Sequence, residues 1–305
     1  MPEKHNFSGL AKRLSRLPAD KRRVALEMSA ALAGVSLRVS REFVDAIPRA
    51  AKILSADDIR SWAEMGRKIA MGNAEMGVGF FSKGVDGLDN VPPTARKHVF
   101  EICTRQLILS SSIALESFNL IPEIALLVDD DDLFGQILKV AADIAGRSAK
   151  HSNDFLKVTP AVAAVIKGFG EDNEKVKTSI VELAGIFANR TGGMAADLWS
   201  MLPGSLHGLA SENAVQLLDK AGEFLEFGGS VTLQFISAGG AVHRASSGSF
   251  EDWCRVARVI ARQGNAVLIS FLRATPKFCV RMEALRLPLD RQEAIRRILH
   301  LMEEI

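Results

Sequence analysis

The stretch SWAEMGRKIAMGNAEMGVGFF, residues 61–81, and the stretch DWCRVARVIARQGNAVLISFL, residues 252–272, follow the same pattern. Each has a Trp at its second position, a Gly-Asn pair in its middle and a Phe near its end. Self-similarity at a distance is the sequence mark of an internal repeat, and repeats decide a fold before any single element does. We therefore searched outward from these two stretches for further copies.

One large apolar residue in each copy gives the register of the repeat. Successive copies are 37, 38, 37, 43, 37 and 36 residues apart, and the long step contains the Gly-rich acidic segment KGFGEDNEKVK at 167–177. The anchor residues are Phe43, Phe80, Phe118, Phe155, Leu198, Phe235 and Phe271.

The columns around the anchors follow helical spacing. The residues 18 positions before the anchor are mostly large, those 14 positions before it are small, and those 11 positions before it are large. This spacing predicts a first helix, A, with one buried stripe. Seven residues before the anchor, each copy has a residue that favours a helix start or a tight turn. These residues predict the start of a second helix, B, and they are Ser36, Asn73, Ser111, Ser148, Thr191, Gly228 and Gly264.

Prolines recur about five residues after the anchor. Because proline lacks the backbone N–H that a helix interior needs, but suits the first turn of a helix, we expect helix B to end there and a short third element to begin. The prolines concerned are Pro48, Pro122, Pro160, Pro203 and Pro276.

These features predict an all-α protein and one right-handed α-solenoid. We expect about seven repeats of about 37 residues over 24–280, a basic cap at 1–23 and a C-terminal capping helix at 281–305. The period and the proline-led third element resemble HEAT and armadillo repeats.

A closer resemblance rests on Trp62, Gly66 and Phe80, and on Phe271 with Pro276. This spacing is similar to the helical region ahead of the von Willebrand factor A domain in bacterial proteins related to the nitric oxide reductase activation protein. The resemblance implies a partner that is an AAA+ ATPase of the MoxR type or a von Willebrand A-domain protein. The chain lacks the DxSxS motif, so the metal-dependent adhesion of that domain is not implied.

Composition and charge narrow the class of protein. Apolar residues make up 48% of the chain, yet no apolar run is long enough for a membrane helix, so we expect no membrane span and a bacterial-type cytoplasmic location. The net charge is +6 over residues 1–100, −7 over 101–250 and +3 over 251–305. This division argues against one continuous phosphate-binding surface and permits self-association of basic ends with an acidic middle.

Cys103, Cys254 and Cys279 are expected to be buried thiols.

The polar residues of helix B predict a partner-binding face. The residues directly before the anchors are mostly polar and lie beside the buried stripe of helix B. In solenoids, this face of the second helix usually lines the concave surface. His151 stands in an otherwise apolar column, where it is a candidate base or ligand or, more simply, a hydrogen-bonded surface residue. The expected face consists of Glu42, His151, Asn153, Asp154, Lys157, Asp197, Trp199, Gln234 and Arg273.

The sequence shows no Walker A loop, HExxH, GxSxG or Cys/His cluster, so we assign no catalytic residue, cofactor or metal ligand. It favours a non-enzymatic scaffold that grips a protein partner with helix B. Two alternatives stay open. One is a nucleic-acid-binding protein similar to HEAT-like DNA glycosylases, and the other is a small-ligand binder or enzyme whose site is assembled from distant repeats.

Overall fold

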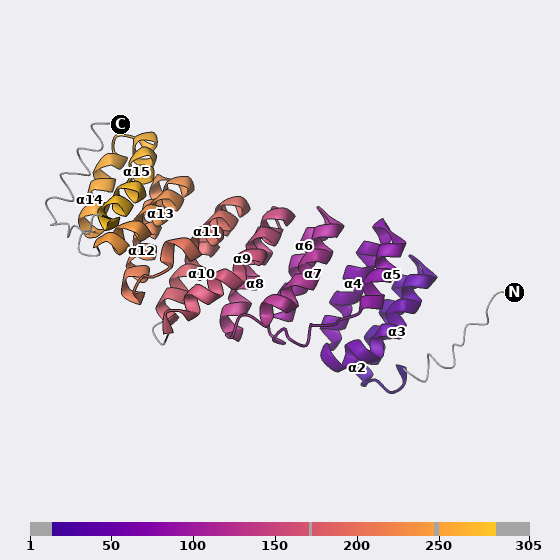
Figure 1. The fold of residues 1–305 in the computed structure, drawn as a ribbon. Helices are drawn as coiled ribbons and strands as arrows, with labels where there is room; N and C mark the ends of the chain where they lie inside the picture. The colour runs from indigo at the N-terminus through magenta and orange to yellow at the C-terminus, as the bar shows by residue number, and fades with distance from the viewer. Residues whose placement is uncertain (1–13, 171–172, 247–249, 285–305) are drawn as a thin grey trace. The chain divides into compact units, whose positions relative to one another are not determined.

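The computed structural model describes residues 14–170, 173–246 and 250–284. These residues form α-helices joined by short turns, with one short 3₁₀ helix and no β-strand among them (Figure 1). The chain divides into two compact units, Met1–Leu156 and Lys157–Ile305. The all-α prediction is confirmed.

In the first unit, helices alternate between two layers. The helix A layer consists of α2 (Ala19–Ala33), α4 (Ala56–Gly72), α6 (Arg96–Leu107) and α8 (Asp131–Ala145). The helix B layer consists of α3 (Leu37–Ile53), α5 (Ala74–Lys83) and α7 (Ser111–Ala125). Within the A layer, α2 packs against α4, α4 against α6, and α6 against α8. Within the B layer, α3 packs against α5, and the rings of Phe80 and Phe118 join α5 to α7 with centroids 5.2 Å apart. Each helical hairpin thus stacks on the next.

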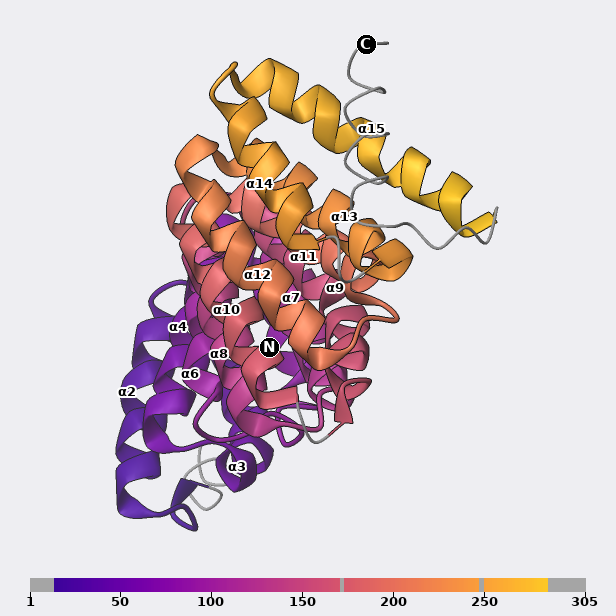
Figure 2. The same cartoon turned by 90° about the vertical axis from the view of Figure 1, so that its left-hand side faces the viewer.

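The second unit repeats this arrangement. Its helices are α10 (Asn173–Arg190), α11 (Gly192–Leu206), α12 (Ser211–Phe224), the 3₁₀ helix η2 (Leu225–Phe227), α13 (Gly229–Ser246), α14 (Phe250–Ala261) and α15 (Asn265–Ala284). In this unit, α10 packs against α12, α11 against α13, and α13 against α15 (Figure 2). The remaining helix, α9 (Ala149–Lys167), contains the boundary between the units.

The predicted anchor residues form the core between the two layers. All seven anchors are buried, and so are both residues that introduced the repeat, Trp62 and Trp253. Trp62 lies 5.5 Å from Phe43 between ring centroids, and Trp253 lies 4.9 Å from Phe235. The same aromatic contact therefore recurs in both units.

Polar contacts between neighbouring hairpins recur at the period of the sequence repeat. The guanidinium of Arg38 pairs with Glu75, 37 residues further on, and Arg105 donates to the carbonyl of Ala142 across the same separation. In the second unit, Arg190 donates to the carbonyl of Leu225, 35 residues further on. These contacts show that equivalent parts of successive hairpins lie side by side within each unit.

Most of the predicted helix B starts are confirmed. The side chains of Ser36, Asn73, Ser148 and Thr191 each accept a hydrogen bond from a backbone N–H in the following turn. The third start is one residue earlier than predicted, because Ser110 rather than Ser111 caps α7. Gly228 and Gly264 adopt φ values of 109° and 118°, which favour glycine, before α13 and α15.

The predicted third element is wrong. Pro48, Pro122, Pro160, Pro203 and Pro276 lie inside α3, α7, α9, α11 and α15, which continue beyond them. A proline inside a helix costs about 3 kcal/mol, because one backbone hydrogen bond is lost. Burial of a leucine side chain contributes about 1.5–3 kcal/mol, and Leu206 is buried in the turn after Pro203. Ala50, after Pro48, is also buried, and its single methyl group contributes about 0.8 kcal/mol. Tertiary packing thus holds the last turn helical.

Two further expectations concern burial and the membrane. The three cysteines are buried thiols, as predicted. Throughout the described ranges, no helix combines the length and the apolar character needed to span a bilayer.

Candidate functional site on the helix B layer

Two residues of the predicted face are buried. The amide oxygen of Asn153 accepts a hydrogen bond from the Ser117 hydroxyl over 3.2 Å, and the indole of Trp199 donates to the Thr159 hydroxyl over 3.1 Å. Asn153 is 4% exposed and Trp199 is fully buried. Both side chains hold neighbouring helices together, so the structure removes them from the accessible face.

The other predicted face residues are accessible and are spread over several helices. In the first unit, Glu42 lies on α3, and His151 and Asp154 lie on α9, all of them half-buried. The carboxylate of Asp154 pairs with Lys150 over 2.6 Å.

In the second unit, Lys157, Asp197 and Arg273 are exposed and Gln234 is half-buried. They lie on α9, α11, α15 and α13, one residue to a helix. The predicted residues therefore mark the helix B side of each unit, but they do not converge on one point.

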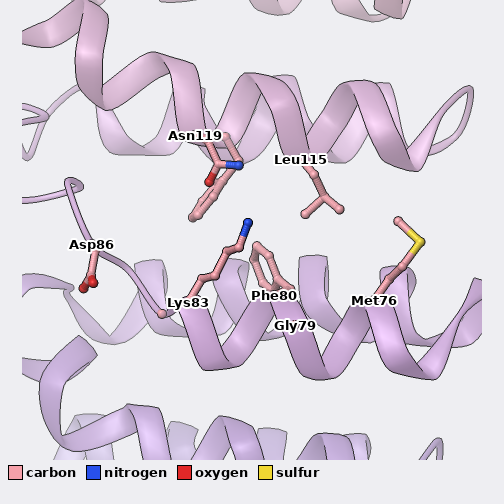
Figure 3. A pocket seen from close by; sticks show the side chains of 9 residues that line it. Met76, Gly79, Phe80, Lys83, Asp86, Leu115 and Asn119 are labelled. Atoms are coloured by element: carbon pink, nitrogen blue, oxygen red, sulfur yellow. The ribbon is translucent and has the colours of Figure 1, made fainter.

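A hollow of about 450 Å³ lies between α5 and α7 of the first unit (Figure 3). It is on the same helix B layer, and Gly79, from the predicted polar column, is part of its wall. The lining residues are Met76, Gly79, Phe80, Lys83, Gly84, Asp86, Leu115, Phe118 and Asn119.

The hollow exists because α5 is short and lacks a side chain where it faces α7. α5 has 10 residues, against 17 in α3 and 15 in α7, and Gly84 ends it with φ at 73°. At Gly79, a Cβ would meet no atom within 4 Å, so the position borders open space. A leucine at this position would project into the hollow.

The floor of the hollow is apolar. The rings of Phe80 and Phe118 form it, and they are 4% and 5% exposed. Met76 and Leu115 are half-buried and lie toward one end, as Figure 3 shows. This end offers an apolar side chain a partly desolvated contact surface.

The rim at the other end is polar. Lys83 from α5 and Asn119 from α7 extend toward one another there (Figure 3), and both side chains are exposed. Asp86 pairs with Arg49 over 2.6 Å, whereas within the described part of the chain the Lys83 ammonium has no ion pair. The rim therefore carries one cation that no carboxylate among residues 14–156 pairs with.

A buried arginine positions the segment that closes this end. The Arg96 guanidinium is 8% exposed and donates to the carbonyl oxygens of Leu88, Val91 and Ile53 at 3.2, 3.1 and 2.6 Å. Since a buried charge is tolerated only when its donors are satisfied, these contacts fix the turn segment 84–95 between α5 and α6. Gly84 and Asp86 of the hollow belong to that segment.

The sequence analysis missed Lys83 and Asn119, although the repeat contains a signal for both. One residue after the anchor, six of the seven copies have a buried apolar residue, and Asn119 is the exception. Three residues after the anchor, Lys83 is the one charged residue among the seven copies. A polar residue in an otherwise apolar column marks the copy in which that column meets solvent.

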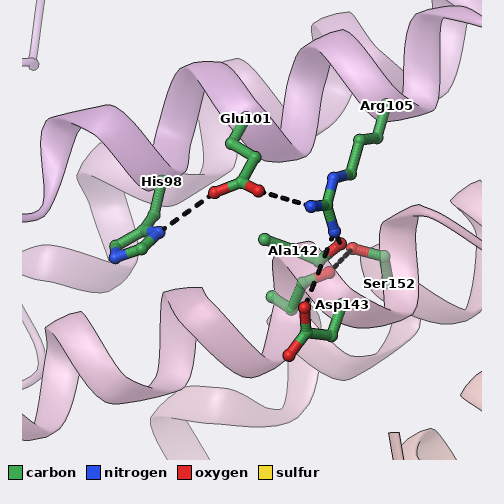
Figure 4. Close-up of polar contacts among 7 residues, drawn as sticks. His98, Glu101, Arg105, Ala142, Asp143 and Ser152 are labelled. Atoms are coloured by element: carbon green, nitrogen blue, oxygen red, sulfur yellow. Dashed lines mark hydrogen bonds and ion pairs between the residues drawn. The ribbon is translucent and has the colours of Figure 1, made fainter. Parts of the chain in front are cut away.

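A polar chain between α6 and α8 is structural. His98 contacts Glu101 over 3.3 Å, and the Glu101 carboxylate accepts a hydrogen bond from Arg105, which also donates to the Ala142 carbonyl and pairs with Asp143 (Figure 4). Arg105 joins α6 to α8, while Glu101 contacts both Arg105 and His98 within α6. We therefore do not treat this cluster as a site.

Three other titratable groups lie in the core. Burial lowers the pKa of His243 to about 4, an effect that the nearby Glu251 carboxylate partly offsets, and neither ring nitrogen has a hydrogen-bond partner. Burial raises the pKa of the Cys254 thiol to about 12 and that of Cys103 also well above its usual range. Both thiols are protonated at neutral pH, which is unsuited to a nucleophile.

Comparisons with known proteins give no match: no family model, no curated protein and no solved structure is significantly similar to this chain. Apart from the half-buried Pro276, the residues behind the resemblance described above are core residues. Trp62 is fully buried, and a Cβ at Gly66 would lie 2.0 Å from the Phe81 ring. Their spacing is explained by packing of α4 against α5.

Proposed function

We propose that this chain is a helical-repeat scaffold that binds another protein through the helix B layer of its first unit. The observation that carries this proposal is the hollow between α5 and α7, with an apolar floor and a polar rim on an otherwise helical surface. Interfaces concentrate binding energy where one large side chain enters such a depression. Its volume is also within the range of sites that bind small molecules or a few residues of a peptide.

The lining favours binding over catalysis. Its lining residues include no Ser, Cys or His, and the one carboxylate, that of Asp86, is engaged by Arg49. A general base within reach of a nucleophile is the minimum for acyl or phosphoryl transfer by side chains. The hollow therefore supports recognition of a partner better than chemistry on a substrate.

The kind of partner follows from the resemblance alone. An AAA+ ATPase of the MoxR type or a von Willebrand A-domain protein stays our prediction for the partner, and a cytoplasmic location and the continuous seven-repeat solenoid stay predictions with it. Nucleic acid is the alternative that the experiment below separates.

The proposal is tested by Gly79→Leu, which fills the hollow. The matched control is Gly135→Leu on α8 of the same unit, where a Cβ also meets no atom within 4 Å. Both variants replace a helical glycine with a good helix former, so the effect of helix propensity on the free energy of unfolding is similar in the two.

Tagged wild-type protein and both variants are used to capture partners from a nuclease-treated native extract. We expect a protein recovered by the wild type and by Gly135→Leu to be lost with Gly79→Leu. Equal recovery with all three would assign the interaction to another surface. A partner that the wild type recovers from an untreated extract, but not from the nuclease-treated one, would favour nucleic acid.

A further inference from the structure

We infer that the hollow accepts an acidic peptide segment, with a large apolar side chain on the Phe80–Phe118 floor and a carboxylate at Lys83 and Asn119. This inference rests on the proposed function and specifies the chemistry of the partner's contact segment. It is argued from the charge of the lining, the order of its groups and the spacing along the two helices.

The charge of the lining selects a carboxylate. Lys83 is the one cationic side chain among the lining residues, and the Asp86 carboxylate is already paired with Arg49. Glu75, one turn before Gly79 on α5, is paired with Arg38. A ligand carboxylate thus meets one unneutralised ammonium, and the Asn119 amide supplies further N–H donors beside it.

The exceptional residues of the two copies that border the hollow support the same inference. In the other six copies, the column of Asn119 is apolar and buried, and the column of Lys83 holds uncharged residues. Packing between hairpins therefore does not require a cation or an amide at these positions. Here they occur together, on two helices, at one end of the same hollow (Figure 3).

The groups are arranged from apolar to polar along both helices. Met76 and Leu115 lie at one end, and Lys83 and Asn119 lie at the other (Figure 3). At 1.5 Å per helical residue, Leu115 and Asn119 are about 6 Å apart along α7, and Met76 and Lys83 are about 10 Å apart along α5. Two residues of extended chain span about 6.6 Å. An apolar residue followed two positions later by Glu or Asp therefore fits the hollow.

The probes are three acetylated, amidated peptides: Gly-Leu-Ser-Glu-Gly, its Gln analogue Gly-Leu-Ser-Gln-Gly, and its Lys analogue Gly-Leu-Ser-Lys-Gly. The readout is the ¹³C-methyl NMR signal of Met76 in protein labelled at its methionine methyl groups. Met194 and Met201, on α11 of the second unit, report any general effect of the peptide. Lys83→Met removes the cation, and Lys68→Met, at an exposed lysine of α4, is the matched control.

We expect the Glu peptide to shift the Met76 signal at the lowest concentration and the Lys peptide at the highest. Lys83→Met should weaken the Glu peptide about twofold to fivefold and leave the Gln peptide unchanged, because an ion pair at an exposed lysine contributes up to about 1 kcal/mol. Lys68→Met should change neither.

Three outcomes would overturn the inference. Equal affinity for the Glu and Gln peptides, with no effect of Lys83→Met, would show that the hollow binds apolar side chains without regard to charge. A Met76 signal that moves more with 4-methylpentanoate than with the peptide would assign the hollow to a small carboxylate. No shift with any probe would exclude this class of segment. The proposed function itself is decided separately, by whether Gly79→Leu loses the captured partner.

Discussion

The indole of Trp199 donates a hydrogen bond to the Thr159 hydroxyl over 3.1 Å, with both side chains fully buried. The indole of Trp253 also donates to a threonine hydroxyl, that of Thr275, over 3.4 Å. Trp62, in contrast, is buried with no hydrogen-bond partner for its indole N–H. The three tryptophans of the chain therefore occupy core positions with different polar requirements.

Replacing these tryptophans with phenylalanine is expected to have unequal costs. Trp199→Phe loses both packing volume and a buried hydrogen bond, whereas Trp62→Phe loses volume but also removes an unsatisfied donor, which costs about 1–3 kcal/mol when buried. We expect Trp199→Phe to lower the free energy of unfolding by about 1–2 kcal/mol more than Trp62→Phe does. Urea titrations followed by circular dichroism measure both. Equal losses would show that the Trp199–Thr159 hydrogen bond does not contribute.

The buried His243 makes stability depend on pH. Its pKa is about 4 in the folded protein and close to 6.5 in the unfolded chain, so between these values the unfolded chain binds more protons. Stability is thus lost as pH falls below about 6.5. From these two values, the contribution of His243 to stability falls by about 2 kcal/mol between pH 7.5 and pH 5.

His243→Phe tests this sign directly. The His243 ring is stacked on Phe250 with centroids 3.8 Å apart, and a phenyl ring preserves an aromatic contact there without a titratable group. Urea unfolding of wild type and variant at pH 5 and pH 7.5 should give a smaller difference between the two pH values for the variant. An unchanged pH dependence would mean that other groups cause it.

Gly240 allows α13 to approach α11 closely. A Cβ at this position would lie 2.2 Å from the backbone oxygen of Ser205, which cannot move independently of its helix. We expect Gly240→Ala to destabilise the protein by about 1–3 kcal/mol through overpacking. At Gly185 on α10, a Cβ meets no atom within 4 Å, so Gly185→Ala should stabilise by about 0.5–1 kcal/mol. Thermal unfolding of the two variants should therefore change in opposite directions.

Arg96 connects the core to the hollow. Arg96→Met removes donors from three backbone carbonyls and is expected to cost about 2–4 kcal/mol. Faster hydrogen exchange at the amides of residues 85–91 would show that the turn segment has loosened. Arg96→Lys keeps the charge but not the three-way geometry, so its effect should be intermediate. Unchanged exchange in Arg96→Met would show that the segment is held by other contacts.

The helix pattern was predictable because it is written in every copy. Each anchor is apolar, and the residue before helix B stands at the same offset in six of the seven copies, so the sequence alone predicts paired helices and their core. The prediction that helix B ends at the prolines failed because proline by itself disfavours a helix interior. The burial of Ala50 and Leu206, which keeps the last turn helical, depends on packing partners distant in sequence.

The candidate site was only partly predictable. The helix B side was expected, yet Trp199 turned out to be buried, because the column after the anchor faces the neighbouring hairpin. Asn153 is buried as well, where its amide meets the Ser117 hydroxyl of α7. The hollow arises from a local shortening of α5 together with the missing side chain of Gly79. Averaging the copies conceals such a feature, whereas comparing one copy with the rest reveals it.

The spacing of contacts between hairpins has a consequence for how the chain is made. Hydrogen bonds that join neighbouring hairpins connect residues 33–43 positions apart, from Glu27 with Arg60 to Gln106 with Ala149. A contact of this kind forms as soon as the next hairpin has left the ribosome, without waiting for the distant end of the chain. The hollow, whose residues all lie between Met76 and Asn119, is therefore complete before the second unit has left the ribosome.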